Sequence, residues 1–355
     1  MQQKTEIIMK IELGISTFGE TTILEKTGKA ISHQQRIKNL VEEIELADKV
    51  GLDVFAIGEH HRQDFAVSSP EMILAAGAVN TKNIKLTSAV TVLSSNDPVR
   101  VYQNFAHIDA LSNGRAEIMV GRGSFTESFP LFGYDLKDYS ELFTEKLDML
   151  LHIKDNEIVT WKGKLTQSID AKGVYPRAID LPIWVATGGN ANSTIEIAKK
   201  GLPIVYAIIG GNPIGFKRLI NGYREIGLKE GYSPEQLKVG AHSWGYIAET
   251  DEKARKDFFF PTQLLVNRIA KERAHWRELD YKGYLEMIGP HGSMFVGSPE
   301  SVAQKLIRII DTLNLDRFLL HLPVGSIPHE DTLNSIKLFG EKVAPIIREY
   351  FANKN

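Results

Sequence analysis

The 355-residue chain contains no cysteine. That absence excludes disulfide bonds, a thiolate nucleophile and cysteine-ligated zinc, and it fits the reducing cytoplasm in which we expect the protein to work. The chain also lacks any uninterrupted apolar run of about 18 residues, which a membrane-spanning helix would need. Its first ten residues, MQQKTEIIMK, are polar and charged. We therefore expect neither a signal peptide nor a membrane anchor.

The chain also has no large excess of positive or negative charge. The formal net charge is -2, from 42 basic and 44 acidic residues, and like charges do not gather into a tail. Strongly basic surfaces are typical of proteins that bind nucleic acid or anionic membranes, so the composition argues against both partners. With 43% hydrophobic and 24% charged residues, the chain has the composition of an ordinary globular protein.

Short apolar segments alternate with longer amphipathic ones along the whole chain. The apolar segments that we interpret as strands are 10–18, 52–58, 84–92, 115–121, 182–187, 203–209, 237–248 and 317–322. The segments with helical periodicity are 33–50, 69–80, 98–112, 138–154, 190–200, 213–230, 250–274, 299–313 and 330–352. Helix-start signals include Ser32, Ser69-Pro70, Asp97-Pro98 and Ser298-Pro299, and glycines that stop helices before a strand are Gly51, Gly114 and Gly201. Repeated helix, glycine, strand and loop are typical of a parallel sheet.

Eight strands and eight helices, followed by a last helix at 330–352, predict an α/β fold, a closed (β/α)8 TIM barrel with insertions in the βα loops. A plain barrel takes about 250 residues, so we assign the surplus to 122–137, 155–181 and 257–298. The stretch WKGKLTQSID in the second interval indicates a small hairpin. An open doubly wound sheet is the rival, but no G-x-G-x-x-G follows the first strand. We expect one domain over 9–355, after a disordered or ragged lead-in at 1–8.

Catalytic groups of such barrels follow the carboxyl ends of the strands. After the second strand come Glu59, His60 and His61. Strand alternation places His60 on one face with Ala56 and Gly58, which leaves room for a ligand above the barrel core. Two adjacent histidines diverge and make a poor metal site, so we expect no bound metal. A catalytic histidine and one that merely caps the next loop remain equally open at this point.

Two further turns carry glycines beside polar residues. Gly121-Arg122-Gly123-Ser124 follows the fourth strand, and an arginine between glycines can form a fork onto a phosphate or carboxylate. After the fifth strand comes Thr187-Gly188-Gly189-Asn190-Ala191-Asn192-Ser193, which leads into a helix. This second turn predicts a phosphate cradle at the helix N-terminus, although Asn190 as a plain N-cap is the alternative.

Four stretches together resemble the bacterial luciferase-like monooxygenase family. They are GLDVFAIGEHH, LTSAVTVLSSNDPVRVYQNFAHIDALSNGRAEIMVGRG, PIWVATGGNANSTIEIAKKGLPIV and GSPESVAQKLIRIIDTLNLDRFLLHLP. The resemblance implies a flavin barrel that uses reduced FMN and molecular oxygen to oxidise a small organic substrate through a C4a-(hydro)peroxyflavin. It implies a non-proline cis peptide at Ala89–Val90 and a catalytic His60 with Glu59. The cofactor-binding positions that it implies are Ala89, Val90, Gly121, Arg122, Ser124, Thr187, Gly188, Gly189, Asn190 and Ser193.

The same resemblance leaves several questions open. We expect His60 to have a pKa near neutrality and to move a proton, and a separate flavin reductase is a possible partner. Helix-rich barrels of this kind tend to form homodimers, for which the helices at 69–80 and 98–112 are candidate contacts. The rival functions are a deazaflavin-dependent dehydrogenase that transfers hydride and a non-catalytic flavin-binding protein.

One insertion and several interior side chains are further candidates for the site. The insertion 257–298, with Tyr281, Tyr284 and His291, is either a lid or a contact loop. We expect His242 and His321, which lie within strands, to be interior side chains with satisfied hydrogen bonds. Aromatic side chains that indicate an apolar substrate pocket are Phe18, Tyr206 and Trp244.

Overall fold

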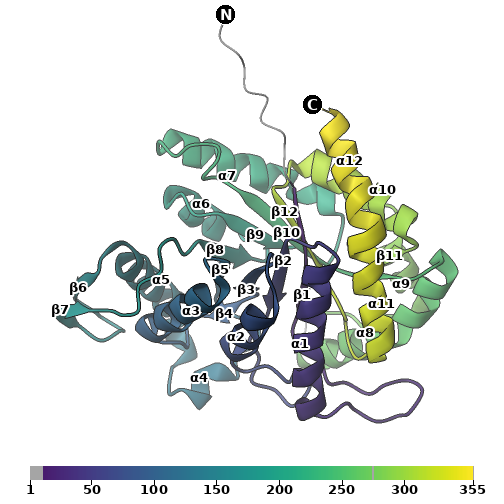
Figure 1. The fold of residues 1–355 in the computed structure, drawn as a ribbon, viewed down its shortest axis with the longest axis horizontal. Helices are drawn as coiled ribbons and strands as arrows, with labels where there is room; N and C mark the ends of the chain where they lie inside the picture. The colour runs from purple at the N-terminus through teal and green to yellow at the C-terminus, as the bar shows by residue number, and fades with distance from the viewer. Residues whose placement is uncertain (1–10, 274–275, 355) are drawn as a thin grey trace, which may run out of the picture.

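Eight parallel strands form the centre of the molecule in a computed structural model, which describes residues 11–273 and 276–354. In barrel order they are β1 (Glu12–Thr17), β2 (Val54–Ile57), β3 (Lys85–Ser88), β5 (Ala116–Gly121), β8 (Ile183–Thr187), β9 (Ile204–Ala207), β10 (Val239–Ile247) and β12 (Arg317–His321). Strand β10 pairs with both β9 and β12, and β12 pairs with β1, so the sheet closes on itself. The predicted (β/α)8 barrel is confirmed (Figure 1).

Helices surround this barrel. The longer ones are α1 (His33–Lys49), α2 (Pro70–Asn80), α3 (Pro98–Ser112), α5 (Tyr139–Asp155), α6 (Ala191–Lys199), α7 (Lys217–Lys229), α8 (Asp251–Glu272), α10 (Pro299–Leu313), α11 (His329–Leu338) and α12 (Ala344–Lys354). A π-helical segment, η3 (Phe339–Val343), joins α11 to α12, and 3-10 segments η1 (Leu136–Asp138) and η2 (Pro213–Phe216) precede α5 and α7. The predicted strands and helices are present close to their expected bounds.

Helix α1 shows how the local sequence sets these elements. The Ser32 side chain accepts a hydrogen bond from the Gln35 N–H and caps the first turn. Leu40, Ile44 and Ala47 recur at helical spacing and are fully buried against the barrel. The chain then turns into β2 through Gly51, whose φ of 77° lies in the left-handed region that favours glycine.

Some elements were not predicted. The expected strand 84–92 is divided into β3 and β4 (Thr91–Val92), and the Ala89–Val90 peptide between them is cis, as the family resemblance implies. The short helices α4 (Ser128–Leu131) and α9 (Tyr281–Ile288) and the strand β11 (Phe295–Gly297) are further additions. The predicted hairpin is present as β6 (Ile158–Trp161) and β7 (Ile169–Gly173), in the connection between α5 and β8. Residues 1–8 lie outside the described residues.

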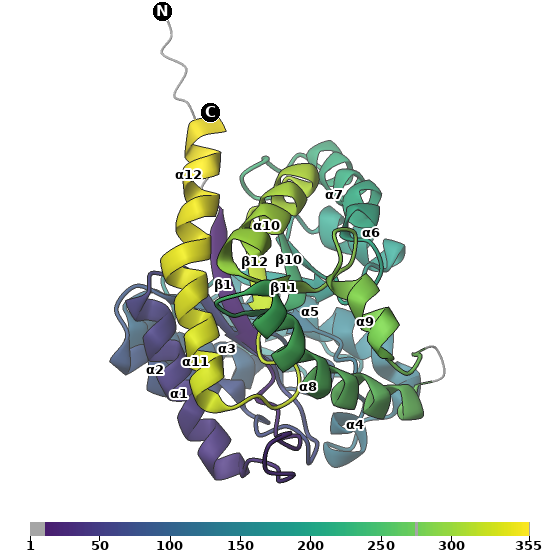
Figure 2. The ribbon, with the colours of Figure 1, turned by 90° about the vertical axis from the view of Figure 1, so that its right-hand side faces the viewer.

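The amino-terminal end of the barrel is filled by side chains. Arg317 is fully buried, and its guanidinium donates to Glu117 at 2.6 and 3.0 Å and to Glu12 at 2.5 and 2.8 Å. Its Cζ lies 4.1 Å from the centre of the Trp184 ring. Above this ion cluster, Val54, Ala56, Met119, Trp184, Val205 and Leu319 pack inside the barrel. Figures 1 and 2 place α4 and the end of α8 at the opposite, carboxyl-terminal end.

We expect Arg317→Met to lower the free energy of unfolding by about 3–5 kcal/mol, because buried Glu117 would lose both hydrogen bonds from Arg317 and keep only the partly exposed Lys85, 3.2 Å away, as a counter-ion. Lys85→Met is the matched control, since the Lys85 side chain is 40% exposed and pairs with the same two carboxylates. Its loss should cost about 1 kcal/mol or less. Urea unfolding at pH 7 measures both variants, and equal losses would contradict the importance assigned to Arg317.

Candidate active site

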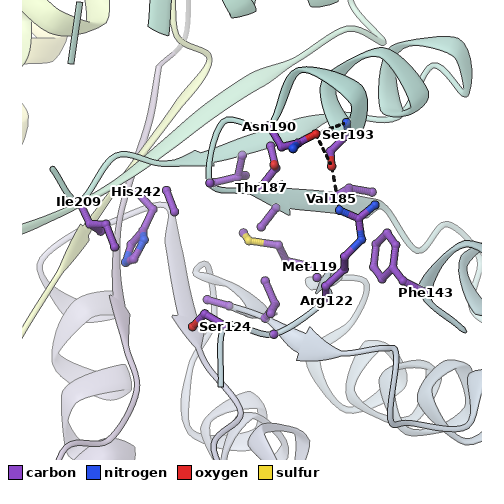
Figure 3. Close-up of a pocket in the computed structure, with 18 of the residues that line it drawn as sticks. Met119, Arg122, Ser124, Phe143, Val185, Thr187, Asn190, Ser193, Ile209 and His242 are labelled. Atoms are coloured by element: carbon purple, nitrogen blue, oxygen red, sulfur yellow. Dashed lines mark hydrogen bonds between the residues drawn. The ribbon is translucent and has the colours of Figure 1, made fainter. Parts of the chain in front are cut away.

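A cavity of about 610 Å³ opens at the carboxyl-terminal end of the barrel. Its walls come from the turns after β1, β3, β5, β8 and β9, from β10 and from the end of α8. Most of the predicted cofactor-binding positions line it: Ala89, Val90, Gly121, Arg122, Ser124, Thr187, Gly188, Asn190 and Ser193. Figure 3 shows Arg122, Ser193 and Phe143 at one side and His242 and Ile209 at the other.

Arg122 and the turn after β8 meet directly. The Arg122 Nη1 donates to the Ser193 Oγ at 2.8 Å, and the guanidinium lies over the Phe143 ring at 5.2 Å (Figure 3). The Arg122 Nε is buried and has no hydrogen-bond partner among the described residues. Strands β5 and β8 are neighbours in the barrel, so two residues far apart in sequence reach the same wall.

The start of α6 adds further donors. The Asn190 Oδ1 accepts from the Ser193 N–H at 3.0 Å and caps the helix, which confirms the N-cap alternative. Capping leaves the N–H groups of Ala191 and Asn192, in the first turn, without partners inside the helix. Both interpretations of this turn are therefore compatible, because a capped helix N-terminus still presents N–H groups and the positive end of its dipole.

The glycines at these turns differ in what surrounds them. A Cβ on Gly121 would lie 2.9 Å from the Val90 side chain, so the close approach of β5 to the cis peptide requires glycine. A Cβ on Gly188 would meet no atom within 4 Å, so this residue borders open space. Gly189 has a φ of +97°, and it does not line the cavity but lies against Phe216.

An unpartnered buried guanidinium nitrogen, a serine hydroxyl and a helix N-terminus are suited to a phosphate dianion. They fit the phosphate of FMN. The barrel interior below, with Met119, Val90 and Ala186, supplies an apolar floor. Within the described ranges, no three His, Asp or Glu side chains group as a metal site. No helix in the same ranges combines the length and apolar character of a membrane span.

Glu59 is buried behind the cavity wall. Its carboxylate accepts from the Val92 N–H at 2.8 Å, from the Asn96 amide at 2.9 and 3.1 Å, and contacts the His61 Nε2 at 2.8 Å. The Glu59 N–H donates to the Val90 carbonyl at 3.2 Å. These bonds hold the chain that follows the cis peptide, so the contacts of Glu59 are those of a positioning residue.

His60 lies in an aromatic enclosure beside the cavity. Its ring is 4.4 Å from Phe65, 4.6 Å from Phe18 and 5.2 Å from Phe125, between ring centres. Phe18 and Phe125 line the cavity, and His60 stands behind them. Burial, followed by the positive charges of His321 and Arg62, lowers the pKa of His60 to about 3. The expectation of a pKa near neutrality is therefore wrong for this enclosure.

The other interior histidines differ from each other. His321 is satisfied as expected, because its Nε2 lies 2.8 Å from Glu20 and its Nδ1 lies 3.4 Å from Ser16. His242 is not, because its Nε2 is buried without a partner in the part of the chain that the structure describes. The expectation that His242 is satisfied is thus wrong, and a histidine on the inward face of the long strand β10 was the available signal.

The region 257–298 covers the cavity only in part. Ile269, Arg273 and Trp276 line it from the end of α8 and the following turn. Tyr284 is buried away from the cavity and donates to the Arg255 carbonyl at 3.0 Å, while Tyr281 packs against Phe259. The cover therefore comes from residues that sequence reasoning had not selected, since nothing local distinguishes their face of α8.

Loop contacts hold this cover in place. Arg62 donates to Glu127 at 2.7 Å and to Glu272 at 2.8 Å, and so joins the turn after β2 to α4 and α8. Arg273 donates to the Ser124 carbonyl, and both Arg62 and Arg273 lie over the Phe125 ring. Tyr139, which sequence reasoning also missed, donates to the Gly123 carbonyl at 2.6 Å.

Comparison with known proteins agrees with this geometry. The family model described as luciferase-like monooxygenase matches residues 12–315. Limonene 1,2-monooxygenase of Rhodococcus erythropolis is 26% identical over 313 residues, which cover 86% of this chain and 80% of that protein.

Solved structures share the fold at lower identity. The monooxygenase RslO1 from Streptomyces bottropensis matches with a TM-score of 0.81 and 21% identity, over 94% of this chain and 99% of that one. The oxygenating constituent of 3,6-diketocamphane monooxygenase from Pseudomonas putida, in complex with FMN, matches with a TM-score of 0.73 and 19% identity, over 95% of this chain and 99% of that one. The coenzyme F420-dependent tetrahydromethanopterin reductase of Methanopyrus kandleri matches with a TM-score of 0.72 and 17% identity, over 95% of this chain and 99% of that one.

We expect His60→Phe to make the protein less sensitive to acid. The pKa of His60 is about 3 in the folded protein against an ordinary 6.5. Below pH 6.5 the unfolded chain therefore binds an extra proton, and the folded protein becomes less stable as the pH is lowered. Between pH 7 and pH 5 this histidine should cost about 2 kcal/mol, which the variant would not lose. Urea unfolding at both pH values measures the difference. Phe18→Leu, which leaves His60 in place, should keep the wild-type dependence, and an unchanged dependence in His60→Phe would show that His60 is not held neutral.

Proposed function

This chain belongs to the luciferase-like monooxygenase family, and we propose that it is an FMN-dependent monooxygenase that oxidises a small organic substrate with molecular oxygen. Reduced FMN is the co-substrate. When bound, it supplies the two electrons with which oxygen is activated, while the protein binds, orients and excludes water.

The observation that carries this proposal is the meeting of Arg122, Ser193 and the α6 N-terminus at one end of the cavity. Together they offer charge and hydrogen-bond donors to a phosphate. The other predicted positions that line the cavity are Ala89, Val90, Gly121, Ser124, Thr187 and Gly188, while Gly189 shapes the turn from behind, against Phe216. Aromatic and aliphatic side chains enclose the rest of the cavity, which favours a reaction that must be kept from water.

His60 is the proposed catalytic residue, and Glu59, the residue before it, is the proposed positioning residue, which holds this segment through Val92, Asn96 and His61. The enclosure keeps His60 neutral and makes it a weak base, so it can accept a proton only once a bound group reaches past Phe18 or Phe125 and relieves the burial that lowers its pKa. A bound ligand that displaces either ring would bring His60 into contact with the cavity.

The rival function within the same fold is hydride transfer with a deazaflavin. The F420-dependent reductase of Methanopyrus kandleri has a comparable TM-score, so the fold alone does not separate the two. A non-catalytic flavin-binding protein is the second rival, which would bind FMN without turning over a substrate. A separate flavin reductase would supply reduced FMN under the monooxygenase proposal.

We also propose a homodimer formed through α2 and α3. Met72 and Val79 on α2 and Leu111 on α3 are 65%, 62% and 48% exposed. Large apolar side chains so exposed on adjacent helices are typical of a protein–protein contact. As a single domain, residues 9–355 would pair with a second copy of the same barrel.

We expect Arg122→Met to weaken FMN binding about 10- to 100-fold, because a charge-assisted hydrogen bond to phosphate contributes about 1.5–3 kcal/mol. Riboflavin, which lacks the phosphate, should bind the variant and the wild type equally. Flavin fluorescence titration measures both dissociation constants. An equal loss for the two flavins would show that Arg122 supports the cavity rather than the phosphate.

We expect His60→Ala to lower turnover by about 100-fold or more while FMN binding is retained. The assay supplies FMN with a flavin reductase and NADH under ¹⁸O₂, and screens aldehydes, alkanes, cyclic ketones and sulfonates for labelled product. His107→Ala, at an exposed histidine of α3, is the control and should keep wild-type activity. Unchanged flavin oxidation and turnover in His60→Ala would refute the catalytic assignment, and turnover with reduced F420 alone would favour the hydride-transfer rival.

A further inference from the structure

The cavity has two chemically different ends. Arg122 and Ser193 mark one end, and His242 and Ile209 mark the other (Figure 3). Near His242 the lining is aromatic, because the Phe18 ring centre lies 6.0 Å from that of His242 and Trp244 follows on the same face of β10. The proposed phosphate contacts use the first end, so the second end is left for another occupant.

His242 is a polar group of this second end whose hydrogen bonds are unused. No hydrogen bond joins either ring nitrogen to a described residue, and Nε2 is buried besides. A buried polar atom without a partner costs about 1–3 kcal/mol, so such atoms usually signal a missing ligand or water. A neutral imidazole offers one donor and one acceptor.

The neighbours of His242 do not supply that partner. His321, whose ring centre is 4.9 Å away, uses its nitrogens on Glu20 and Ser16. Phe18 fills the space between the two histidines and His60, and it offers no hydrogen bond. The Trp244 and Trp276 rings are tilted by 39° to each other, with their centres 6.1 Å apart.

The charge at this end limits the ligand further. Burial, and then the charge of His321, lowers the pKa of His242 well below its ordinary value, so the imidazole is neutral at pH 7. Arg273, which also lines the cavity, donates to the Ser124 carbonyl and lies over Phe125. A neutral hydrogen-bonding group is therefore better matched to His242 than an anion.

We propose that His242 is the specificity-determining residue of the substrate, and that the substrate is a mainly apolar molecule whose carbonyl or hydroxyl oxygen hydrogen-bonds to it. The surrounding aromatic and aliphatic side chains bind the hydrocarbon part. His321, fixed by Glu20 and Ser16, is a positioning residue that limits the orientations of His242.

This inference rests on the proposed function in one respect, that FMN occupies the Arg122 end. The test uses protein loaded with oxidised FMN, which does not turn over, and paired probes of equal shape. Cyclohexanone is compared with methylenecyclohexane, and 2-decanone with 2-methyl-1-decene. Calorimetry or the fluorescence of Trp244 and Trp276 gives the dissociation constants.

We expect the wild type to bind at least one ketone about tenfold more tightly than its hydrocarbon partner, as one hydrogen bond to an otherwise unpaired group would give. His242→Phe should abolish the preference and leave FMN affinity unchanged, whereas His242→Gln should restore part of it. Ile209→Ala is the matched control at the same end of the cavity. It should weaken both members of a pair equally and keep their ratio.

Several results would overturn the assignment. They are no ketone preference in the wild type, a preference retained in His242→Phe, tighter binding of cyclohexanecarboxylate than of cyclohexanone, and no binding of either pair. Weakened FMN binding in His242→Phe would place the cofactor, not the substrate, against this residue. If the protein fails to bind FMN but still discriminates the ketone through His242, the proposed function fails and this inference stands.

Discussion

The Arg317 ion cluster closes one end of the barrel and so decides where a ligand can go. Its guanidinium neutralises Glu12 and Glu117, which begin or nearly begin their strands, and it rests on Trp184. Burying three charges is tolerable only when each is paired and hydrogen-bonded. Because this end is filled by side chains, the space inside the wall lies at the other end, where the strands finish and the turns diverge.

Strand order then explains why sequence reasoning located one half of the site well. The turns at Gly121–Ser124 and Thr187–Ser193 carry local signals, namely glycines, an arginine and an N-cap, that can be recognised without a structure. Their meeting needs only that β5 and β8 be neighbours, which follows from the alternation of strands and helices. Alternation along β2 likewise placed Ala56 inside the barrel and Phe55 outside, as the two core clusters confirm.

The other half depends on contacts that no local pattern encodes. The pKa of His60 is set by Phe65 and Phe125, which come from separate loops, and by charges on Arg62 and His321. The hydrogen bonds of Glu59 reach Val92 and Asn96 beyond the cis peptide, so its sequence neighbours gave no sign of a positioning role. The cover over the cavity comes from one face of α8 and the following turn, and that face is set by burial of Phe258, Leu265 and Ile269, with Arg62 bound to Glu272 at the end of the helix.

Three histidines surround Phe18, and His321 influences the pKa values of the other two. The Phe18 ring lies 4.2 Å from His321, 4.6 Å from His60 and 6.0 Å from His242, so one apolar ring adjoins three titratable groups. Burial first, and then the electrostatic effect of His321, lowers the pKa of both His60 and His242. Arg122 supplies a cation at one end of the cavity, and the imidazole of His242, whose pKa is lowered by burial, borders the other end. An anionic cofactor group would then match the Arg122 end of the cavity and a neutral substrate the His242 end, which would fix their order along the cavity.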